Sequence, residues 1–398
     1  MNEDISLDDI RFFEDKYNIE KNKKIEKEIK KYGLKKACLN DNDYKYFFNL
    51  ELPEVKIYNQ YNSHQCNIYA FLRVVKDIMR KNTDLNIDDL DISANYIAFF
   101  DKLEKINVLY NELINLDDVK FQDINKLVDR YIGSFGTFHS CKQIVNKYGL
   151  VLSKDMKEVD SKYDDNLSIE LLQEKIKIDA LSFIKLELKE KIKQKKELLY
   201  EAYQFLSKIY GNPPSEFEFK NQIMTPVQFK NTYLKDELND FVTVTSLDKK
   251  DLLASYSYIP NIYLNDDEEI ITLKQSEIST AIINQIKDGI SIWFSSEEST
   301  KADYENSILD DKSYKFEKML NIKSIKKEEK IVLNIINYDH AMCITGILVE
   351  DCHIKQLKVD NSFGNYGKYN GHFIMTPTFL ENCVITLIMS KKNIYHKD

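Results

Sequence analysis

The chain has 398 residues, 43% of them hydrophobic and 30% charged, with a net charge of −9 at pH 7. This apolar fraction suffices for a large core of two or three lobes, and the abundance of Tyr and Phe excludes global disorder. The negative charge argues against a nucleic-acid-binding protein, and no apolar stretch has the length of about 18 residues that a membrane span needs.

The first half of the chain has helical periodicity. Residues 5–35 carry spaced apolar side chains on a Lys/Glu background. The run CNIYAFLRVVKDIMR at 66–80 predicts a buried helix, with Asn62 and Ser63 upstream as candidate capping residues. Residues 94–150 are mostly helical in pattern, and residues 166–210 predict a helical hairpin that stops at the turn sequence GNPP.

After residue 240 the pattern changes to short β-favouring runs that are separated by turn residues. These runs are DFVTVTSL, ISIWFSS, KIVLNIINY, AMCITGILV, IKQLKVD, GHFIM and CVITLIM. A helical half followed by an antiparallel β half predicts an α+β fold, in which the junction of the two halves is the natural place for a catalytic site.

The cysteines predict the compartment. Six of them lie at irregular spacings without a CxxC pair, at positions 38, 66, 141, 343, 352 and 383. A disulfide scaffold is not expected in a chain of this length, so the thiols are predicted to be reduced. The N-terminal sequence MNEDISLDDIRFF is acidic and lacks the apolar run of a secretory signal. We therefore expect a cytoplasmic protein.

One cysteine lies where an irregular segment enters the predicted helix at 66–80. At this position the helix N-terminus would stabilise the thiolate of Cys66, and the N–H groups there could bind an oxyanion. Gln60, six residues earlier, can supply a second oxyanion hydrogen bond through its amide. A lone cysteine is more often a small buried apolar residue, so the spacing alone leaves two interpretations of Cys66 open: a buried thiol and a nucleophile.

Two residues of the second half would complete the chemistry. His340 opens the run HAMCITGILV, and Asn361 directly follows QLKVD. A thiol nucleophile needs a base whose pKa is near neutral, which histidine provides. The histidine in turn needs a group that fixes its ring, which the side-chain oxygen of an asparagine can do. The candidate catalytic residues are therefore Cys66, His340, Asn361 and Gln60, although their spacing alone is not specific.

The segments around these residues resemble the bleomycin hydrolase/aminopeptidase C family of papain-like cysteine peptidases. NQYNSHQC at 59–66 is similar to the family's NQxxSGRCW, YDHAMCITG at 338–346 to its HAMVLTG, and VDNSFGNYGKYNGHF at 359–373 to its VENSWG…GYF. Weaker likeness extends through ISANYIAFFDKLEKIN (92–107), VNKYGLV (145–151), FLSKIYGNPPSEFEF (205–219), MTPVQFKNTYL (224–234) and DGISIWFSS (288–296). The resemblance covers residues 45–390.

The resemblance implies a papain-like two-lobe fold with a helical left lobe, a β-rich right lobe and a long helical insertion. It places an N-terminal helical segment at 1–55, the lobe with the nucleophile at 56–160, the insertion at 161–240 and the β-rich lobe at 241–398. It also assigns roles: Cys66 as nucleophile, His340 as base and then acid, Asn361 as the residue that orients His340, and Gln60 as the oxyanion donor.

The resemblance further implies hydrolysis of peptides without a metal or organic cofactor. Members of the family act mainly as aminopeptidases and typically form homohexamers, so we expect peptide substrates and a homo-oligomer. Binding of nucleic acid is disfavoured by the net charge of −9, and no membrane partner is expected.

Four positions depart from the family pattern and are the candidate substrate-cleft residues. His64 and Gln65 replace Gly-Arg, Asn67 replaces a Trp, and Phe363 replaces the Trp of NSWG. The chain also stops at KKNIYHKD, short of the family's C-terminal arm, whose carboxylate lies near the substrate's amino group. The short arm favours an endopeptidase as the alternative, and the changed residues favour a degenerate homologue that acts as a binding or structural oligomer.

A further alternative is a metal site. His340, Cys343, Cys352 and His353 are the residue types that bind zinc, but their spacing does not match common zinc sites. Strand alternation would also send neighbouring residues of these runs to opposite faces of a sheet. The sequence therefore favours a thiol peptidase over a metal site.

Overall fold

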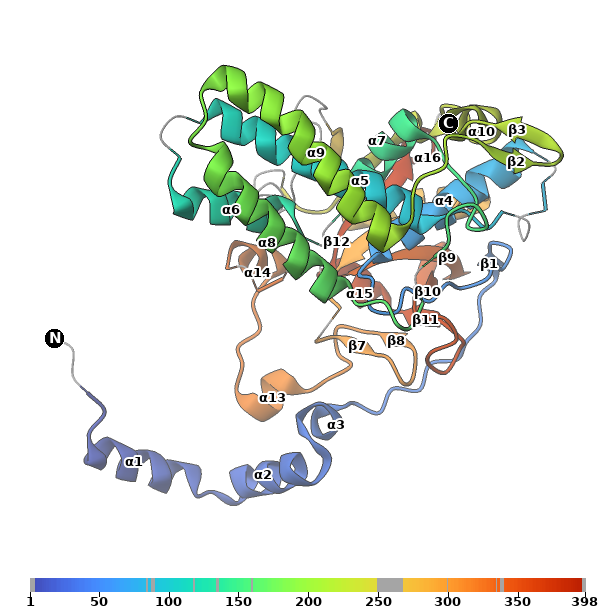
Figure 1. The fold of residues 1–398 in the computed structure, drawn as a ribbon. Coiled ribbons are helices and arrows are strands. Elements are labelled where there is room, and N and C mark those ends of the chain that lie inside the picture. The colour runs from blue at the N-terminus through green and yellow to red at the C-terminus, as the bar shows by residue number, and fades with distance from the viewer. Residues whose placement is uncertain are drawn as a thin grey trace.

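A computed structural model gives the fold, and Figure 1 shows its ribbon. The structure describes residues 4–83, 85–86, 90–116, 119–133, 136–158, 160–248, 268–298, 300–333, 335–336 and 340–395. In this part of the chain no helix is long and apolar enough to cross a membrane.

The N-terminal residues form an arm that extends away from the body of the molecule (Figure 1). Its helices are α1 (Leu7–Tyr17), α2 (Glu20–Tyr32) and α3 (Leu34–Cys38). Ser6 caps α1 through a reciprocal pair of hydrogen bonds with Asp9. Since neither α1 nor α2 has a buried residue, local capping and helix propensity support them rather than a core.

The helices that the sequence predicts in the first half of the chain are present in the structure, where they form a helical lobe. Helices α8 and α9 form the predicted hairpin, and α9 packs along α5 (Figure 1). The lobe contains α4 (Cys66–Asn82), α5 (Ala94–Asn115), α6 (Phe121–Tyr131), α7 (Phe138–Tyr148), α8 (Asp165–Phe183), α9 (Leu188–Tyr210), the hairpin β2 (Phe217–Phe219) and β3 (Gln222–Met224), α10 (Pro226–Tyr233) and the 3-10 helix η2 (Glu237–Asp240).

In the described residues ten strands form one mostly antiparallel sheet, in the order β5-β4-β12-β6-β9-β10-β11-β8-β7, with β1 paired to β9. The strands are β1 (Leu50–Glu51), β4 (Phe241–Thr245), β5 (Ile270–Thr272), β6 (Ile292–Ser296), β7 (Ala302–Asp303), β8 (Ile308–Leu309), β9 (His340–Glu350), β10 (His353–Asp360), β11 (His372–Met375) and β12 (Val384–Ser390). The flanking helices are α12 (Gln275–Lys287), α13 (Phe316–Leu320), α14 (Lys327–Val332), α15 (Pro377–Asn382) and α16 (Lys391–Ile394).

One predicted strand is wrong. The first residues of the run KIVLNIINY at 330–338 are helical and belong to α14. The Glu329 carboxylate accepts a hydrogen bond from the backbone N–H of Lys326, and acidic residues occupy the first turn of α14. Both features favour the start of a helix at this point. A short apolar run does not distinguish a buried helix from a strand by its periodicity. Residues 334 and 337–339 of this run lie outside the described residues.

Strand β9 separates two hydrophobic cores, because its side chains alternate between the faces of the sheet. Ala341 and Cys343 face the core of the helical lobe, whereas Met342 and Ile344 face a second core under α12. Helix α4 packs against β9 and β6. This packing brings the first residue of α4 to the junction of the helices and the sheet.

Candidate active site

Cys66 is the first residue of α4, and its side chain is partly buried. The residue before it, Gln65, stands at the cap position without a side-chain capping bond, so the predicted caps Asn62 and Ser63 do not serve this helix. The first N–H groups of α4 therefore have no capping side chain, and the N-terminus of a helix favours a negative charge. This is the environment that stabilises a thiolate.

His340, the first residue of β9, hydrogen-bonds the Cys66 thiol. The backbone N–H of Ala341 also donates to the sulfur. The far ring nitrogen, Nε2, lies 2.7 Å from Asn361 Oδ1. Register between the strands sets this arrangement: β9 lies between β6 and β10, and Asn361 directly follows β10. The structure thus brings together a thiol, an imidazole and an amide from three segments.

The charges in this cluster shift the two titratable groups in opposite directions. Burial by itself would raise the pKa of the Cys66 thiol, but the charge and hydrogen bond of His340 and the N–H of Ala341 outweigh it and lower that pKa. Burial would lower the pKa of His340, yet the Glu298 carboxylate and the Cys66 thiolate raise it to about 10. Both shifts favour a thiolate–imidazolium pair at neutral pH.

Asn361 is held from several sides. Its oxygen accepts the backbone N–H of Ser362 at 2.7 Å in addition to the His340 ring, and its own backbone N–H donates to Gly371 at 3.0 Å. Phe363 stacks on the His340 ring with centroids 5.1 Å apart and a 22° interplanar angle. The phenyl ring therefore covers the imidazole, as an apolar group at this position should.

Gln60 is buried and has a fixed orientation. Its side-chain oxygen accepts the Ser362 hydroxyl at 2.7 Å, and its backbone N–H donates to the Ser362 carbonyl at 2.8 Å. Because the oxygen takes the hydroxyl, the Nε2 amide group is the donor end that remains for an oxyanion. The segment that holds Asn361 thus also orients Gln60.

The four cleft candidates occupy different environments. His64 is exposed with φ of 52°, a left-handed conformation that a glycine adopts without strain. Gln65 is buried and donates to Asn95 at 3.2 Å. Asn67 is buried, donates to Cys141 at 3.6 Å, and accepts from the Trp293 indole on its backbone carbonyl at 3.2 Å.

The buried amide of Asn67 also explains why residue 136 is a glycine. A Cβ at Gly136 would lie 2.3 Å from Asn67 Nδ2, so the neighbouring chain approaches the amide too closely for a side chain. The side chains of Gln65 and Asn67 therefore bond within the helical lobe, whereas His64 is exposed two residues before Cys66 and Phe363 lies on the imidazole.

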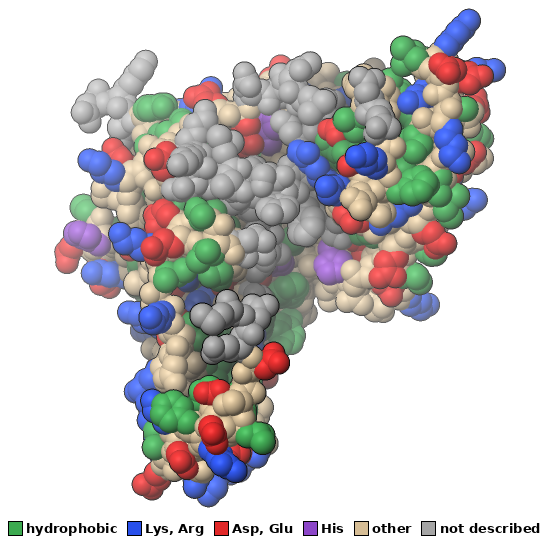
Figure 2. Space-filling view, turned by 90° about the vertical axis from the view of Figure 1, so that its left-hand side faces the viewer, with side chains coloured by type: hydrophobic (Ala, Val, Ile, Leu, Met, Phe, Trp, Pro, Cys, Tyr) green, Lys and Arg blue, Asp and Glu red, His purple; other side chains and the backbone are tan. Residues whose placement is uncertain are grey.

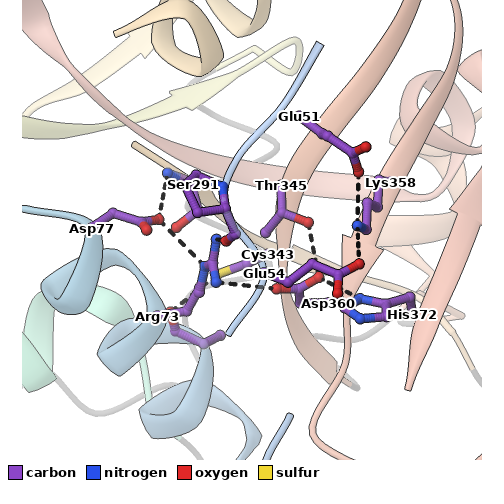
Figure 3. Close-up of polar contacts among 12 residues, drawn as sticks. Glu51, Glu54, Arg73, Asp77, Ser291, Cys343, Thr345, Lys358, Asp360 and His372 are labelled. Carbon is purple, nitrogen blue, oxygen red and sulfur yellow. Dashed lines mark hydrogen bonds and ion pairs between the residues drawn. The ribbon is translucent and has the colours of Figure 1, made fainter. Parts of the chain in front are cut away.

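A buried charge network connects helix α4 to β10, the strand before Asn361 (Figure 3). Arg73 of α4 lies between Asp77 and Asp360, with nitrogen–oxygen distances of 3.4 and 3.7 Å. Asp360 also binds Thr345 and His372, each at 2.8 Å. Although burial would raise the pKa of Asp360, Arg73 and His372 hold it below its usual value.

The residues of the alternative metal site are separated in the fold. Cys343 donates its thiol to the Ala70 carbonyl at 3.0 Å, and Cys352 and His353 lie at the turn at the opposite end of β9 from His340. Over the described ranges, no group of three or more His, Cys, Asp or Glu is placed to hold a metal ion.

A thiol at a helix N-terminus, an imidazole on a strand and an amide that fixes the imidazole define the class of papain-like cysteine peptidases. The chain matches the model of the Peptidase C1-like family over residues 4–398 and belongs to that family. This match confirms the family, the α+β papain-like fold and the cysteine peptidase that the sequence predicts.

Individual relatives align over nearly the whole chain. Aminopeptidase C of Listeria innocua is 26% identical, over 98% of this chain and 94% of the relative. Aminopeptidase E of Lactobacillus helveticus is also 26% identical, over 95% and 91%. The solved structure of PepW from Lactobacillus rhamnosis HN001 superposes with a TM-score of 0.85 at 24% identity, over 99% of this chain and 94% of that chain.

Proposed function

We propose that this protein is a cysteine aminopeptidase in which Cys66, His340, Asn361 and Gln60 form the catalytic site. The observation that carries the proposal is the cluster of Cys66, His340 and Asn361, with its lowered thiol pKa and raised imidazole pKa. The names of the aligned relatives, aminopeptidases C and E, support the preference for free amino termini.

In the proposed acylation step the Cys66 thiolate attacks the scissile carbonyl carbon and a C–S bond forms. The carbonyl oxygen becomes an oxyanion, which accepts from the first N–H of α4 and from Gln60 Nε2. The His340 imidazolium donates its proton to the amide nitrogen, so the C–N bond breaks and an amine leaves. A thioester on Cys66 and a neutral His340 remain.

Deacylation reverses these roles. Neutral His340 takes a proton from water, whose oxygen attacks the thioester carbon. The C–S bond then breaks, and the carboxylic acid product leaves with the thiolate–imidazolium pair restored. Asn361 keeps the ring in place through both steps, since its oxygen bonds Nε2 while the other ring nitrogen faces the thiol.

Substrates with free and blocked amino termini test the proposal. Aminoacyl-coumarins and their N-acetyl derivatives would be compared with the full chain under reducing conditions. We expect kcat/KM for the free substrates to exceed that for the blocked ones by at least about 100-fold, because an ammonium anchor is worth a few kcal/mol. The reverse preference would indicate an endopeptidase, and no turnover of any substrate would indicate a degenerate homologue.

We also propose that the partner of this chain is a second copy of itself, in the homohexamer that the family resemblance implies. The N-terminal arm supports this, because it exposes large apolar side chains to solvent in the single chain. In Figure 2 the arm is the downward projection, with hydrophobic side chains between charged ones. Ile5, Leu7, Phe12, Phe13 and Ile19 are all at least half exposed. Sedimentation at the monomer mass of 46.9 kDa would contradict this proposal.

The proposed compartment is the cytoplasm. All six cysteines are free, and four of them are buried. The catalytic role that we propose for Cys66 requires a thiolate, which a reducing compartment preserves.

A further inference from the structure

A buried carboxylate lies beside the proposed catalytic histidine on the side away from the thiol. Glu298 follows β6 by two residues, and its Oε2 is 3.6 Å from His340 Nε2. The side chain is 3% exposed. Pairing of β6 with β9 places it there, because Ser296 is opposite His340 in the register. The position of Glu298 is therefore fixed by the sheet.

The backbone around Glu298 is held in place as well. Its carbonyl accepts from the N–H groups of Lys301 and Ala302, at 3.0 and 2.9 Å. The preceding residue, Glu297, is also buried, but its carboxylate accepts from the Thr300 hydroxyl at 2.8 Å. Two adjacent buried carboxylates thus have different environments, and Glu298 is the one beside the imidazole.

The groups around His340 come from three segments of the chain. Helix α4 presents the Cys66 thiol, the segment after β6 presents the Glu298 carboxylate, and the segment after β10 presents the neutral amide of Asn361 and the ring of Phe363. Nε2 bonds Asn361 at the shorter distance of 2.7 Å. Glu298 therefore acts on the ring mainly through its charge.

We propose that Glu298 is a positioning residue that stabilises the imidazolium form of His340 and thereby the thiolate–imidazolium pair. This inference rests on the proposed function of the site. A carboxylate within about 4 Å of an imidazolium in a buried site is strongly stabilising, because the low local dielectric weakens screening. The same charge opposes the thiolate of Cys66, but less strongly, because the thiol lies on the other side of the ring.

The sequence carries little sign of this role. Glu297 and Glu298 follow the run ISIWFSS, and an acidic pair after a strand usually marks a solvated turn. Only the return of β9 beside β6 buries the pair and brings one carboxylate to the histidine.

The test follows the ionisation of His340 in the full chain. Histidine labelled with ¹³C would be observed by NMR in the wild type and in Glu298→Gln, which removes the charge and keeps the shape. His340→Asn identifies the signal. We expect His340 in Glu298→Gln to lose its proton at least about one pH unit lower than in the wild type. The alkaline limb of kcat/KM should shift with it, since that limb reports the loss of the imidazolium.

Two further variants separate charge from structure. Glu297→Gln removes an equal charge one residue away and should leave the titration of His340 unchanged. Glu298→Asp keeps the charge but withdraws it by one methylene, so its titration should lie between those of the wild type and Glu298→Gln. Thermal unfolding of each variant checks that it folds. If Glu298→Gln does not fold, the titration of His340 in Glu298→Asp tests the proposal by itself.

Equal titration of His340 in the wild type and in the two Glu298 variants would overturn the proposal. An experimental failure of the proposed peptidase function can be distinguished from a failure of this proposal. If the wild type hydrolyses no peptide substrate, the NMR titration still reports the effect of Glu298 on His340. A shifted titration without turnover would then keep the positioning role and reject the peptidase.

Discussion

Replacement of Cys66 by alanine is expected to lower kcat/KM for aminoacyl-coumarin hydrolysis by at least about 10⁴-fold. The thiolate forms the covalent bond of the proposed acyl-enzyme, and no neighbouring group can replace it. The substitution removes only one sulfur atom at the start of α4 and leaves the contacts of that helix with β9 and β6 intact. Activity should therefore fall while the thermal stability changes little.

Cys352→Ala is the matched control. Cys352 is exposed at the β9–β10 turn, far along the strand from His340, so its loss should leave kcat/KM unchanged. Alkylation with iodoacetamide adds a second measurement, because the lowered pKa of Cys66 should let it react at lower pH than an ordinary thiol does. Residual activity of Cys66→Ala within tenfold of the wild type would reject Cys66 as the nucleophile.

Arg73→Ala is expected to lower the free energy of unfolding by about 3–5 kcal/mol, because it removes the buried cation that lies between two buried carboxylates. Arg73 is 6% exposed and lies between Asp77, which is fully buried, and Asp360 (Figure 3). It also donates to the Pro53 carbonyl at 3.1 Å. The loss of Arg73 should also disturb the proposed active site, because its partner Asp360 directly precedes Asn361 in the chain.

Chemical denaturation measures this effect at fixed protein concentration, with Arg130→Ala as the control. Arg130 is an exposed residue at the end of α6, so its replacement should change the unfolding free energy by no more than about 0.5 kcal/mol. A loss below about 1 kcal/mol for Arg73→Ala would show that water or rearranged partners compensate the two carboxylates.

The sequence allowed the helices and most strands to be predicted, because their periodicities are local. The helix that begins at Cys66 and the strands that contain His340 and precede Asn361 all follow from runs of apolar residues. The run at 330–338 was the exception, since an apolar run of that length fits either a helix or a strand. Capping by Glu329 favoured the helix.

The tertiary contacts around the site could not be predicted in the same way. Ser362 orients Gln60, Arg73 binds Asp360, and Glu298 lies beside His340, yet no pattern in the chain links the members of these pairs. Each pair joins different segments, and its partners are chosen by strand order and register. A shift of one residue in the β6–β9 pairing would turn the side chains of β6 to the opposite faces.

The sequence by itself determined the residue types of the proposed site and their order along the chain, because the proposed nucleophile, base and amide stand in short motifs beside predictable helices and strands. It also determined the family, since those motifs extend over most of the chain. Only the tertiary structure decided how the charges are distributed around the histidine. Coulomb interactions depend on distance and burial, and both arise when α4, β6, β9 and β10 pack together.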